Sequence, residues 1–374
     1  MRRTLLLTND FPPRAGGIQS YVAELAARLP ADRLVVYAPA WEGAAEYDAA
    51  QPFRVHRHPT SLMLPTRDVA DTAGRLIAEH DLTAVWFGAA APLGLLASSM
   101  RLHGARRTVA CTHGHEVGWS MVPGARRLLR RIADTNDVLT FVSRYSRRRI
   151  SPALGPSAAL EYLPPGVDAT VFHPDPAARA AIREQHGLGT APTVVCVSRL
   201  VPRKGQDALI RSWPQVLDEV PDARLLIVGG GRYGSTLDRL IERNKLQHSV
   251  IRTGSVAGPA LAEYYAAADV FAMPCRTRGG GLDVEGLGIV FLEASATSLP
   301  VVAGDSGGAP ETVLPERTGV VVDGRDTDAV AAACARLLSD GQLAQRFGRA
   351  GRAWVQSAWT WQESADRLVA LLSR

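Results

Sequence analysis

Cysteine and long apolar runs are scarce in this sequence of 374 residues, and each scarcity excludes a class of protein. The 4 cysteines include no CxxC pair, so the sequence predicts neither a zinc site nor a disulfide framework. No apolar run reaches the roughly 18 residues of a membrane-spanning helix. The apolar part of the N-terminal stretch is too short for a signal peptide. These absences indicate a protein of the reducing cytoplasm.

Basic charge is concentrated in the first half of the chain. Residues 1–160 hold 20 arginines and 13 acidic residues, a net charge of +7, whereas the remaining residues hold 22 basic and 24 acidic ones, a net charge of −2. Such a basic half indicates an anionic partner: a nucleic acid, an anionic lipid surface or a phosphorylated substrate. Neither a base-reading helix motif nor an aromatic stacking platform is visible, which weighs against nucleic acid.

Short β-rich apolar runs alternate with helical runs along the whole chain. Strands are expected at TLLLT, LVVYA, FRVHR, AVWFG, TVACT and VLTFV in the first half, and at TVVCVSRL, ARLLIVGGG, SVIRTG, DVFAMP, PVVAG and GVVVD in the second. A stretch rich in proline and glycine near residue 164 reads as a linker between them. This alternation predicts an α/β protein with two doubly wound parallel sheets, whose ligands bind at the carboxyl ends of the strands.

The stretch CRTRGGGLDVEGLGIVFLEASA, residues 275–296, combines a glycine-rich loop with two glutamates. A helix is expected to begin near Gly288, so that the N–H groups of Gly288, Ile289 and Val290 point toward a phosphate. Glu285 and Glu293 do not suit a phosphate, but carboxylates accept paired hydrogen bonds from vicinal hydroxyls. The stretch therefore predicts a nucleotide-sugar site, with helix-capping glutamates as the alternative.

The loop VSRLVPRKG follows the first strand of the second half. Arg199 and Lys204 flank a proline there, and Lys204 is one of only 2 lysines in the chain. Two fixed cations at a strand end suit the growing charge of a leaving diphosphate. A solvated basic loop is the alternative.

Two glycine-flanked loops in the first half are further candidates. Gly16 and Gly17 lie between the first strand and the first helix, where backbone N–H groups are exposed to an anion. A tight strand-to-helix turn explains them equally well. His113 follows another strand in CTHGHEVGW, where a structural histidine is the common case. Its neighbours His115 and Glu116 do not complete a metal-binding pattern, and no metal site is expected.

A GxGxxG pattern begins at Gly229, directly after the strand ARLLIVG. It matches the fingerprint of dinucleotide sites, but no acidic residue ends the next strand where a ribose-binding carboxylate would stand. A glycine-rich loop near another nucleotide is the preferred interpretation.

Arginines cluster on one predicted helix of the basic half. Their i, i+1, i+4 and i+5 spacing places them on one helical face: Arg126, Arg127, Arg130 and Arg131. A solvated face is the ordinary explanation, and an anionic membrane surface is the alternative that the local excess of positive charge favours.

Taken in their order along the chain, these motifs resemble those of family 4 retaining glycosyltransferases of the two-domain GT-B fold. The resemblance rests on the Gly16–Gly17 loop, His113, Arg199 with Lys204, and the Glu285/Glu293 pair with seven residues between them. The stretches TNDFPPRAGGIQSY and CRTRGGGLDVEGLGIVFLEASA are most similar to those of actinobacterial phosphatidylinositol mannosyltransferases that add a second, α-1,6-linked mannose from GDP-mannose.

The resemblance implies a division of labour between two domains facing a cleft. Residues 1–168 would receive a glycolipid acceptor and face the membrane, together with a C-terminal helix at 356–374 that crosses back to them. Residues 169–355 would bind the nucleotide sugar.

The resemblance also implies roles for individual residues. Arg199 and Lys204 would bind the diphosphate, and Glu293 the ribose. Glu285 would hold the mannose with backbone from Gly286 to Val290. The remaining implied roles are His113 at the donor sugar, Gly16, Gly17 and Gly229 in donor binding, Val256 near the base, Asp10 and Gln19 at the acceptor, and Arg126, Arg127, Arg130 and Arg131 at the membrane.

The same resemblance implies the cellular setting and the chemistry. The protein would attach peripherally to the inner face of the cytoplasmic membrane and would need no cofactor and no divalent metal. Three alternatives remain: another GDP- or UDP-hexose with another acceptor, an NAD-dependent oxidoreductase using the Gly229 loop, and a sugar-nucleotide-binding regulator without catalysis.

Overall fold

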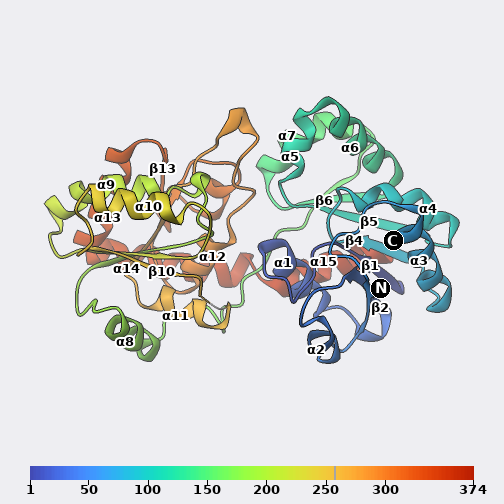
Figure 1. The fold of residues 1–374 in the computed structure, drawn as a ribbon, viewed down its shortest axis with the longest axis horizontal. Coiled ribbons are helices and arrows are strands. Elements are labelled where there is room, and N and C mark those ends of the chain that lie inside the picture. Colours follow the sequence, from blue (N-terminus) through green and yellow to red (C-terminus); the bar gives the residue numbers. More distant parts are fainter. Residues whose placement is uncertain (257) are drawn as a thin grey trace. The chain divides into compact units, whose positions relative to one another are not determined.

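The computed structural model describes residues 1–256 and 258–374, which form two compact units. Unit 1 comprises Met1–Gly166 and Trp361–Arg374, and unit 2 comprises Val167–Thr360 (Figure 1). The first boundary between the units therefore lies after Gly166, two residues before the boundary after residue 168 that the sequence predicts. The second boundary lies between α14 (Gly341–Ala358) and α15 (Trp361–Ser373), so the expected boundary at 356 lies inside α14.

Unit 1 is built on a parallel sheet of seven strands in the order β3-β2-β1-β4-β5-β6-β7. The strands are β1 (Thr4–Leu7), β2 (Leu34–Pro39), β3 (Arg54–His58), β4 (Ala84–Phe87), β5 (Arg107–Thr112), β6 (Val138–Phe141) and β7 (Leu160–Tyr162). Besides α15, the α-helices are α1 (Gly17–Ala26), α2 (Ala44–Ala49), α3 (Arg67–Glu79), α4 (Ala97–Leu102), α5 (Glu116–Met121), α6 (Pro123–Thr135) and α7 (Arg144–Leu154). Short 3-10 turns lie at Ala31–Arg33 and Leu93–Leu96.

Unit 2 repeats this architecture with six parallel strands in the order β10-β9-β8-β11-β12-β13. The strands are β8 (Thr193–Val197), β9 (Arg224–Val228), β10 (Val250–Gly254), β11 (Val270–Met273), β12 (Val301–Gly304) and β13 (Gly319–Val322). Besides α14, the α-helices are α8 (Pro176–Gln185), α9 (Gln206–Glu219), α10 (Gly234–Arg243), α11 (Leu261–Ala266), α12 (Ile289–Ala296) and α13 (Thr327–Ser339). The 3-10 turns are Pro202–Lys204, Gly258–Ala260, Gly279–Gly281 and Ala309–Thr312.

The central strands of both sheets are buried on both faces, which explains why they read as continuous apolar runs rather than as alternating ones. Every residue of β1, β4, β8 and β11 is buried. In both sheets the chain order reverses beside the first strand, between β1 and β4 in unit 1 and between β8 and β11 in unit 2. Open α/β sheets bind ligands at this point, just beyond the carboxyl ends of the strands. The two doubly wound sheets that the sequence predicts are confirmed.

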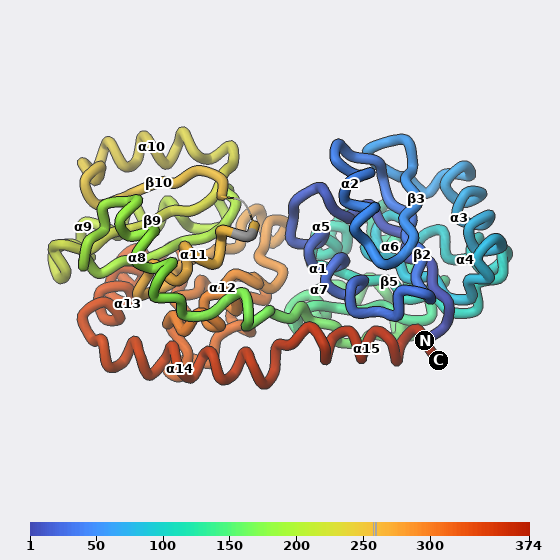
Figure 2. The backbone as a smooth tube through the Cα atoms, turned by 90° about the horizontal axis from the view of Figure 1, so that it is seen from below, coloured from blue at the N-terminus to red at the C-terminus, as the bar shows by residue number. Residues whose placement is uncertain are grey.

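The last helix, α15, belongs to unit 1 although α14 before it belongs to unit 2. Its apolar residues Trp361, Leu368 and Leu372 are buried, and the carbonyl of Leu371 accepts a hydrogen bond from Arg107 at the start of β5. Arg2 donates to the carbonyl of Arg374, so the two chain ends lie side by side, as Figure 2 shows. The described residues include no helix that is both long and apolar enough to cross a membrane.

Candidate active site

The loops that follow β8 and β11 carry most of the charged candidates in unit 2. Lys204 lies in the 3-10 turn after β8 and is buried, with its Nζ 2.7 Å from Oε2 of Glu285. Glu285 lies in the loop between β11 and α12 and is also buried. Burial by itself would raise the pKa of Glu285, but the charges of Lys204 and Arg203 outweigh it and hold that pKa below its ordinary value. The sequence motifs therefore meet as a buried ion pair at the switch point of the sheet.

Arg203 joins this pair, although sequence analysis did not single it out. Its Nε lies 3.6 Å from Oε2 of Glu285, and its Nη1 lies 3.4 Å from Oδ1 of Asp283. Arg199 is exposed at the end of β8, and its charge also lowers the pKa of Glu285. The only signal for Arg203 in the sequence is its position next to Lys204 in VPRKG.

Hydrogen bonds tie the loop after β8 to the loop after β11. The carboxylate of Asp207, at the start of α9, accepts hydrogen bonds of 2.8 and 2.9 Å from Arg276 and one of 2.6 Å from Arg211. The backbone N–H of Arg276 donates to the carbonyl of Arg203 at 2.8 Å. Because Asp207 is itself buried, these contacts fix the two loops, and with them Lys204 and Glu285, against each other.

The helix α12 begins directly after this loop. Gly288 caps its N-terminus with φ of 89°, and Ile289 and Val290 form its first turn, half-buried. No side chain of the described residues caps this end of the helix, so its N–H groups and the positive end of its dipole can bind an anion. Gly286 lies half-buried in the loop just before.

Glu293 lies within α12, and its Oε2 accepts a hydrogen bond of 2.7 Å from the hydroxyl of Tyr265. Burial raises the pKa of Glu293 to about 7, although the hydrogen bond from Tyr265 and the charge of Lys204 act in the opposite direction. Nothing in the sequence points to Tyr265, because its contact with Glu293 depends on how α11 packs.

The glycine loop after β9 packs against the loop that carries Arg199. A side chain at Gly229 would place its Cβ 2.0 Å from the carbonyl oxygen of Ser198, and one at Gly231 would meet the carbonyl of Leu200 at 2.4 Å. The N–H of Leu200 also donates to the carbonyl of Gly230. Close approach of two backbones thus requires Gly229 and Gly231, which accounts for the first two glycines of the GxGxxG pattern without a dinucleotide. Val256 lies half-buried after β10.

In unit 1, the candidates gather beyond the ends of β1, β4 and β5. Asp10 and Gln19 are brought together, because Nε2 of Gln19 donates to Oδ1 of Asp10 at 2.8 Å. Gly16 caps α1 and Gly17 is its first residue, both exposed. Any Cβ at Gly16 would collide with the amide of Gln19. The glycine turn thus lies against one member of the Asp10–Gln19 pair.

His113 is held in one orientation and one protonation state. Its Nε2 lies 2.6 Å from the carbonyl oxygen of Gly88, which can only accept, so Nε2 carries the proton and Nδ1 is the acceptor. Burial lowers the pKa of His113, although the charge of Glu116 acts in the opposite direction. The lowered pKa keeps the ring neutral at pH 7. The carboxylate of Glu116 accepts from the N–H groups of His113 and Gly114 and so fixes the loop. His113 therefore presents a neutral acceptor nitrogen.

The four arginines of α6 all lie exposed on its outer face. Arg126 donates to the carbonyl of Pro152, and Arg130 pairs with Asp134. Arg127 and Arg131 form no ion pair with any residue that the structure describes. No group of three histidine, cysteine, aspartate or glutamate side chains suited to a metal ion occurs in the described residues.

Two doubly wound parallel sheets in one chain, each with polar residues beyond the carboxyl ends of its strands, are the architecture of the GT-B fold. Two family models agree: one described as "Glycosyltransferase Family 4" matches residues 15–171, and one described as "Glycosyl transferases group 1" matches residues 178–354. The chain belongs to this glycosyltransferase family, and it is an enzyme of that class.

Curated relatives extend the similarity to the full chain. The GDP-mannose-dependent alpha-(1-6)-phosphatidylinositol monomannoside mannosyltransferase of Mycolicibacterium smegmatis is 59% identical over 99% of this chain and 98% of its own length. The GDP-mannose-dependent monoacylated alpha-(1-6)-phosphatidylinositol monomannoside mannosyltransferase of Corynebacterium glutamicum is 49% identical over 99% of this chain and 98% of its own length. Among solved structures, Anabaena Alr3699/HepE has a TM-score of 0.84 at 19% identity over 100% of both chains, which supports the fold.

Proposed function

We propose that this protein transfers mannose from GDP-mannose to a phosphatidylinositol monomannoside and forms an α-(1-6) linkage with retention of configuration. The observation that carries the proposal is the 59% identity, over 99% of the chain, to a mannosyltransferase named for this donor and this acceptor. The buried Lys204–Glu285 pair and the uncapped start of α12 supply the chemistry that such a donor requires.

In this proposal the donor lies along the loops of unit 2. Arg199, Lys204 and the N–H groups of Gly288, Ile289 and Val290 hold the diphosphate, because cations and a helix N-terminus stabilise its charge. Glu293 accepts hydrogen bonds from the ribose. Glu285, with Gly286, binds the mannose hydroxyls, so that Lys204 exchanges part of its contact with Glu285 for the diphosphate. Val256 lies near the base, and Gly229 keeps the Arg199 loop in place.

The residues of unit 1 are proposed to serve the acceptor and the transferred sugar. Nδ1 of His113 accepts a hydrogen bond from a mannose hydroxyl, and the Asp10–Gln19 pair orients the acceptor beside the Gly16–Gly17 turn. In the reaction, the bond from the anomeric carbon to the β-phosphate oxygen breaks and a bond to the acceptor oxygen forms on the same face. The acceptor's proton passes to the leaving phosphate.

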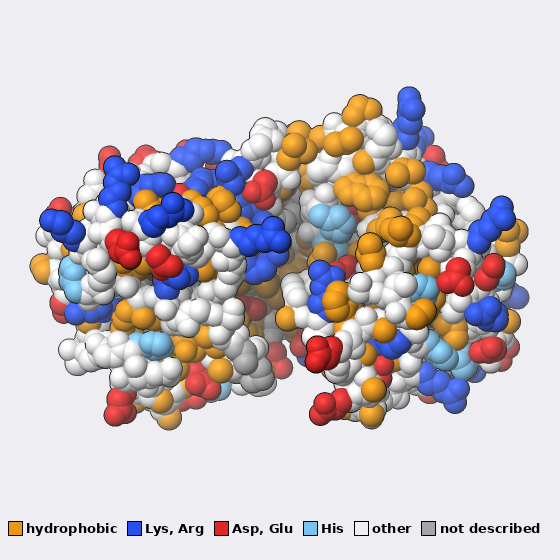
Figure 3. All heavy atoms as spheres, in the orientation of Figure 1, with side chains coloured by type: hydrophobic (Ala, Val, Ile, Leu, Met, Phe, Trp, Pro, Cys, Tyr) orange, Lys and Arg blue, Asp and Glu red, His pale blue; other side chains and the backbone are white. Residues whose placement is uncertain are grey.

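The proposal includes no divalent metal, because two cationic side chains, Arg199 and Lys204, and the N-terminus of α12 are assigned to the charge of the diphosphate. It also includes peripheral attachment to an anionic membrane, since the acceptor is a lipid and α6 presents an exposed arginine face. Exposed apolar side chains accompany that face: Met121 is 40%, Val122 50% and Leu128 41% exposed. Figure 3 shows hydrophobic and basic side chains adjoining over the part of unit 1 that contains α5 to α7.

Calorimetric titration of the wild-type enzyme with GDP, UDP and NAD tests the donor assignment. We expect GDP to bind most tightly, with an affinity that EDTA leaves unchanged. Binding of NAD alone would overturn the proposal, and preference for UDP would assign another donor. Binding of GDP without turnover of GDP-mannose would identify a regulator instead of an enzyme.

A further inference from the structure

Tyr265 is a buried tyrosine whose hydroxyl group has, among the residues that the structure describes, one hydrogen-bond partner, the carboxylate of Glu293. The ring is fully buried and packs at 5.7 Å from the rings of Phe172 and Phe271. The hydroxyl group donates to Oε2 of Glu293 at 2.7 Å, which is a short hydrogen bond to a carboxylate. No other described residue donates to the side chain of Glu293, so its Oε1 is left for a ligand.

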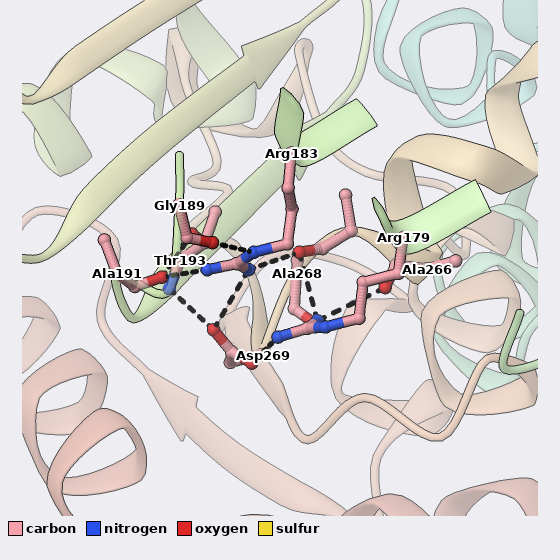
Figure 4. Close-up of polar contacts among 9 residues, drawn as sticks. Arg179, Arg183, Gly189, Ala191, Thr193, Ala266, Ala268 and Asp269 are labelled. Carbon is pink, nitrogen blue, oxygen red and sulfur yellow. Dashed lines mark hydrogen bonds and ion pairs between the residues drawn. The ribbon is translucent and has the colours of Figure 1, made fainter. Parts of the chain in front are cut away.

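The helix that carries Tyr265 is short and is clamped at its C-terminus (Figure 4). Arg179, from α8, donates to the carbonyls of Ala266, Ala267 and Ala268 at 3.3, 3.1 and 2.7 Å. Arg183, one turn further along α8, also donates to the carbonyl of Ala267 at 2.8 Å. These carbonyls have no partner inside a helix that ends here, and cations satisfy them well.

Asp269 connects the clamp to the sheet. Its Oδ1 accepts from Arg179 at 2.6 Å, and its Oδ2 accepts from the N–H of Thr193, the first residue of β8, at 2.8 Å. Oδ2 also lies 3.7 Å from Nη1 of Arg183. The C-terminal end of α11 is therefore fixed to the amino-terminal ends of the central strands β8 and β11, which restricts the movement of the adjoining Tyr265.

We infer that Tyr265 is a positioning residue for donor binding: it fixes Oε2 of Glu293 so that Oε1 faces the ribose hydroxyls of the donor. The inference rests on the proposed function, because Glu293 is assigned to the ribose there. A carboxylate on a helix otherwise samples several rotamers, and ordering it on binding costs affinity. The preformed hydrogen bond removes that cost and leaves one oxygen directed at the ligand.

The variant Tyr265→Phe tests this, because it removes the hydroxyl and keeps the ring between Phe172 and Phe271. Tyr264→Phe is the matched control: it makes the same change on the same helix, at a buried tyrosine whose hydroxyl lies 3.4 Å from Nε2 of His186 and not at Glu293. Titrations with GDP and with 2′,3′-dideoxy-GDP, which lacks the ribose hydroxyls, separate the ribose contact from all others.

In the wild type we expect GDP to bind more tightly than 2′,3′-dideoxy-GDP. Tyr265→Phe should weaken the binding of GDP about tenfold, which is the usual effect of losing a hydrogen bond to a charged group. The affinity for dideoxy-GDP should not change. The KM for GDP-mannose should rise by a similar factor with kcat nearly constant. Tyr264→Phe should change none of these values.

The inference is overturned if Tyr265→Phe prefers GDP over dideoxy-GDP as strongly as the wild type does. An equal loss of affinity for both ligands would be such a result and would indicate a structural role alone. Glu293→Gln provides a second measurement: adding Tyr265→Phe to it should change GDP affinity no further, and an additional loss of similar size would show that Tyr265 acts elsewhere. If the wild type fails to bind GDP at all, the proposed function fails, and the inference fails with it.

Discussion

Burial, one phenolic donor and one nearby cation determine the protonation of Glu293. Burial raises its pKa to about 7, and the groups that act against this are the hydroxyl of Tyr265 on α11 and the ammonium of Lys204 on the loop after β8. An ionised carboxylate accepts hydrogen bonds from ribose hydroxyls, whereas the protonated acid loses one of its acceptors.

We therefore predict that GDP binding weakens as the pH falls through 7. For a group with this pKa, affinity should be roughly tenfold lower at pH 6 than at pH 8. The phosphates of GDP also titrate in this range, so the quantity to measure is the ratio of affinities for GDP and 2′,3′-dideoxy-GDP, in which the phosphates cancel. A ratio that stays constant from pH 6 to pH 8 would contradict this account of Glu293.

Lys204 and Glu285 form a buried ion pair on which both stability and turnover should depend. Lys204→Met removes the nearest cation from the buried carboxylate of Glu285 and leaves it the longer contact with Arg203, so the free energy of unfolding should fall by about 3 kcal/mol. Turnover of GDP-mannose should fall about 10²- to 10³-fold, because a cation at the leaving phosphate is lost.

A double variant separates the two effects of Lys204. Lys204→Met with Glu285→Gln should regain most of the lost stability in urea unfolding, since neither member of the pair is then charged, and should stay inactive. Lys245→Asn is the control at the other lysine, which is exposed with φ of 56°, a conformation that asparagine tolerates. Near-normal turnover by Lys204→Met would show that Lys204 does not serve the diphosphate.

At the scale of elements, α12 depends on the glycine at its start. Gly288 has φ of 89°, and a Cβ there would lie 2.7 Å from the ring of buried Phe291. Gly288→Ala should therefore lower the free energy of unfolding by about 1–3 kcal/mol and weaken GDP binding by shifting the N–H groups of the first turn. Gly341→Ala, at the open start of α14, should leave both unchanged. Equal behaviour of the two variants in unfolding and GDP titration would contradict the role given to the start of α12.

The elements were largely predictable from the sequence, whereas the contacts between them were not. Continuous apolar runs such as TVVCV and DVFAM predict buried strands, and the structure has β8 and β11 there. The edge strand β7 was missed, because its three half-buried residues form no apolar run. The start of α12 followed from Gly288, but the pairing of Glu293 with Tyr265 comes from the docking of α11, which no local pattern encodes.

At the scale of the whole molecule, the uneven charge has a defined location. The basic excess of residues 1–160 lies in unit 1, where α6 exposes its arginines beside Met121, Val122 and Leu128. This placement supports the proposed attachment to an anionic membrane, which the sequence suggested from the spacing of these arginines and the excess of positive charge in the same half.

We predict salt-dependent binding to vesicles that contain an anionic phospholipid and little binding to neutral ones. Arg127→Gln with Arg131→Gln should weaken binding roughly tenfold or more, at about 1 kcal/mol per arginine near the surface. Arg243→Gln with Arg349→Gln removes the same charge from exposed positions of unit 2 and should have no effect. Equal losses in a vesicle-sedimentation assay would mean that total charge, and not the α6 face, governs attachment.

The most direct measurement is mannose transfer from radiolabelled GDP-mannose to purified phosphatidylinositol monomannoside, with the linkage of the product determined. The account predicts a dimannoside with a new α-(1-6) linkage, little transfer from UDP-glucose, and loss of the product in Lys204→Met but not in Lys245→Asn. Absence of transfer by a folded wild-type enzyme that binds GDP, or transfer to a different position, would contradict it.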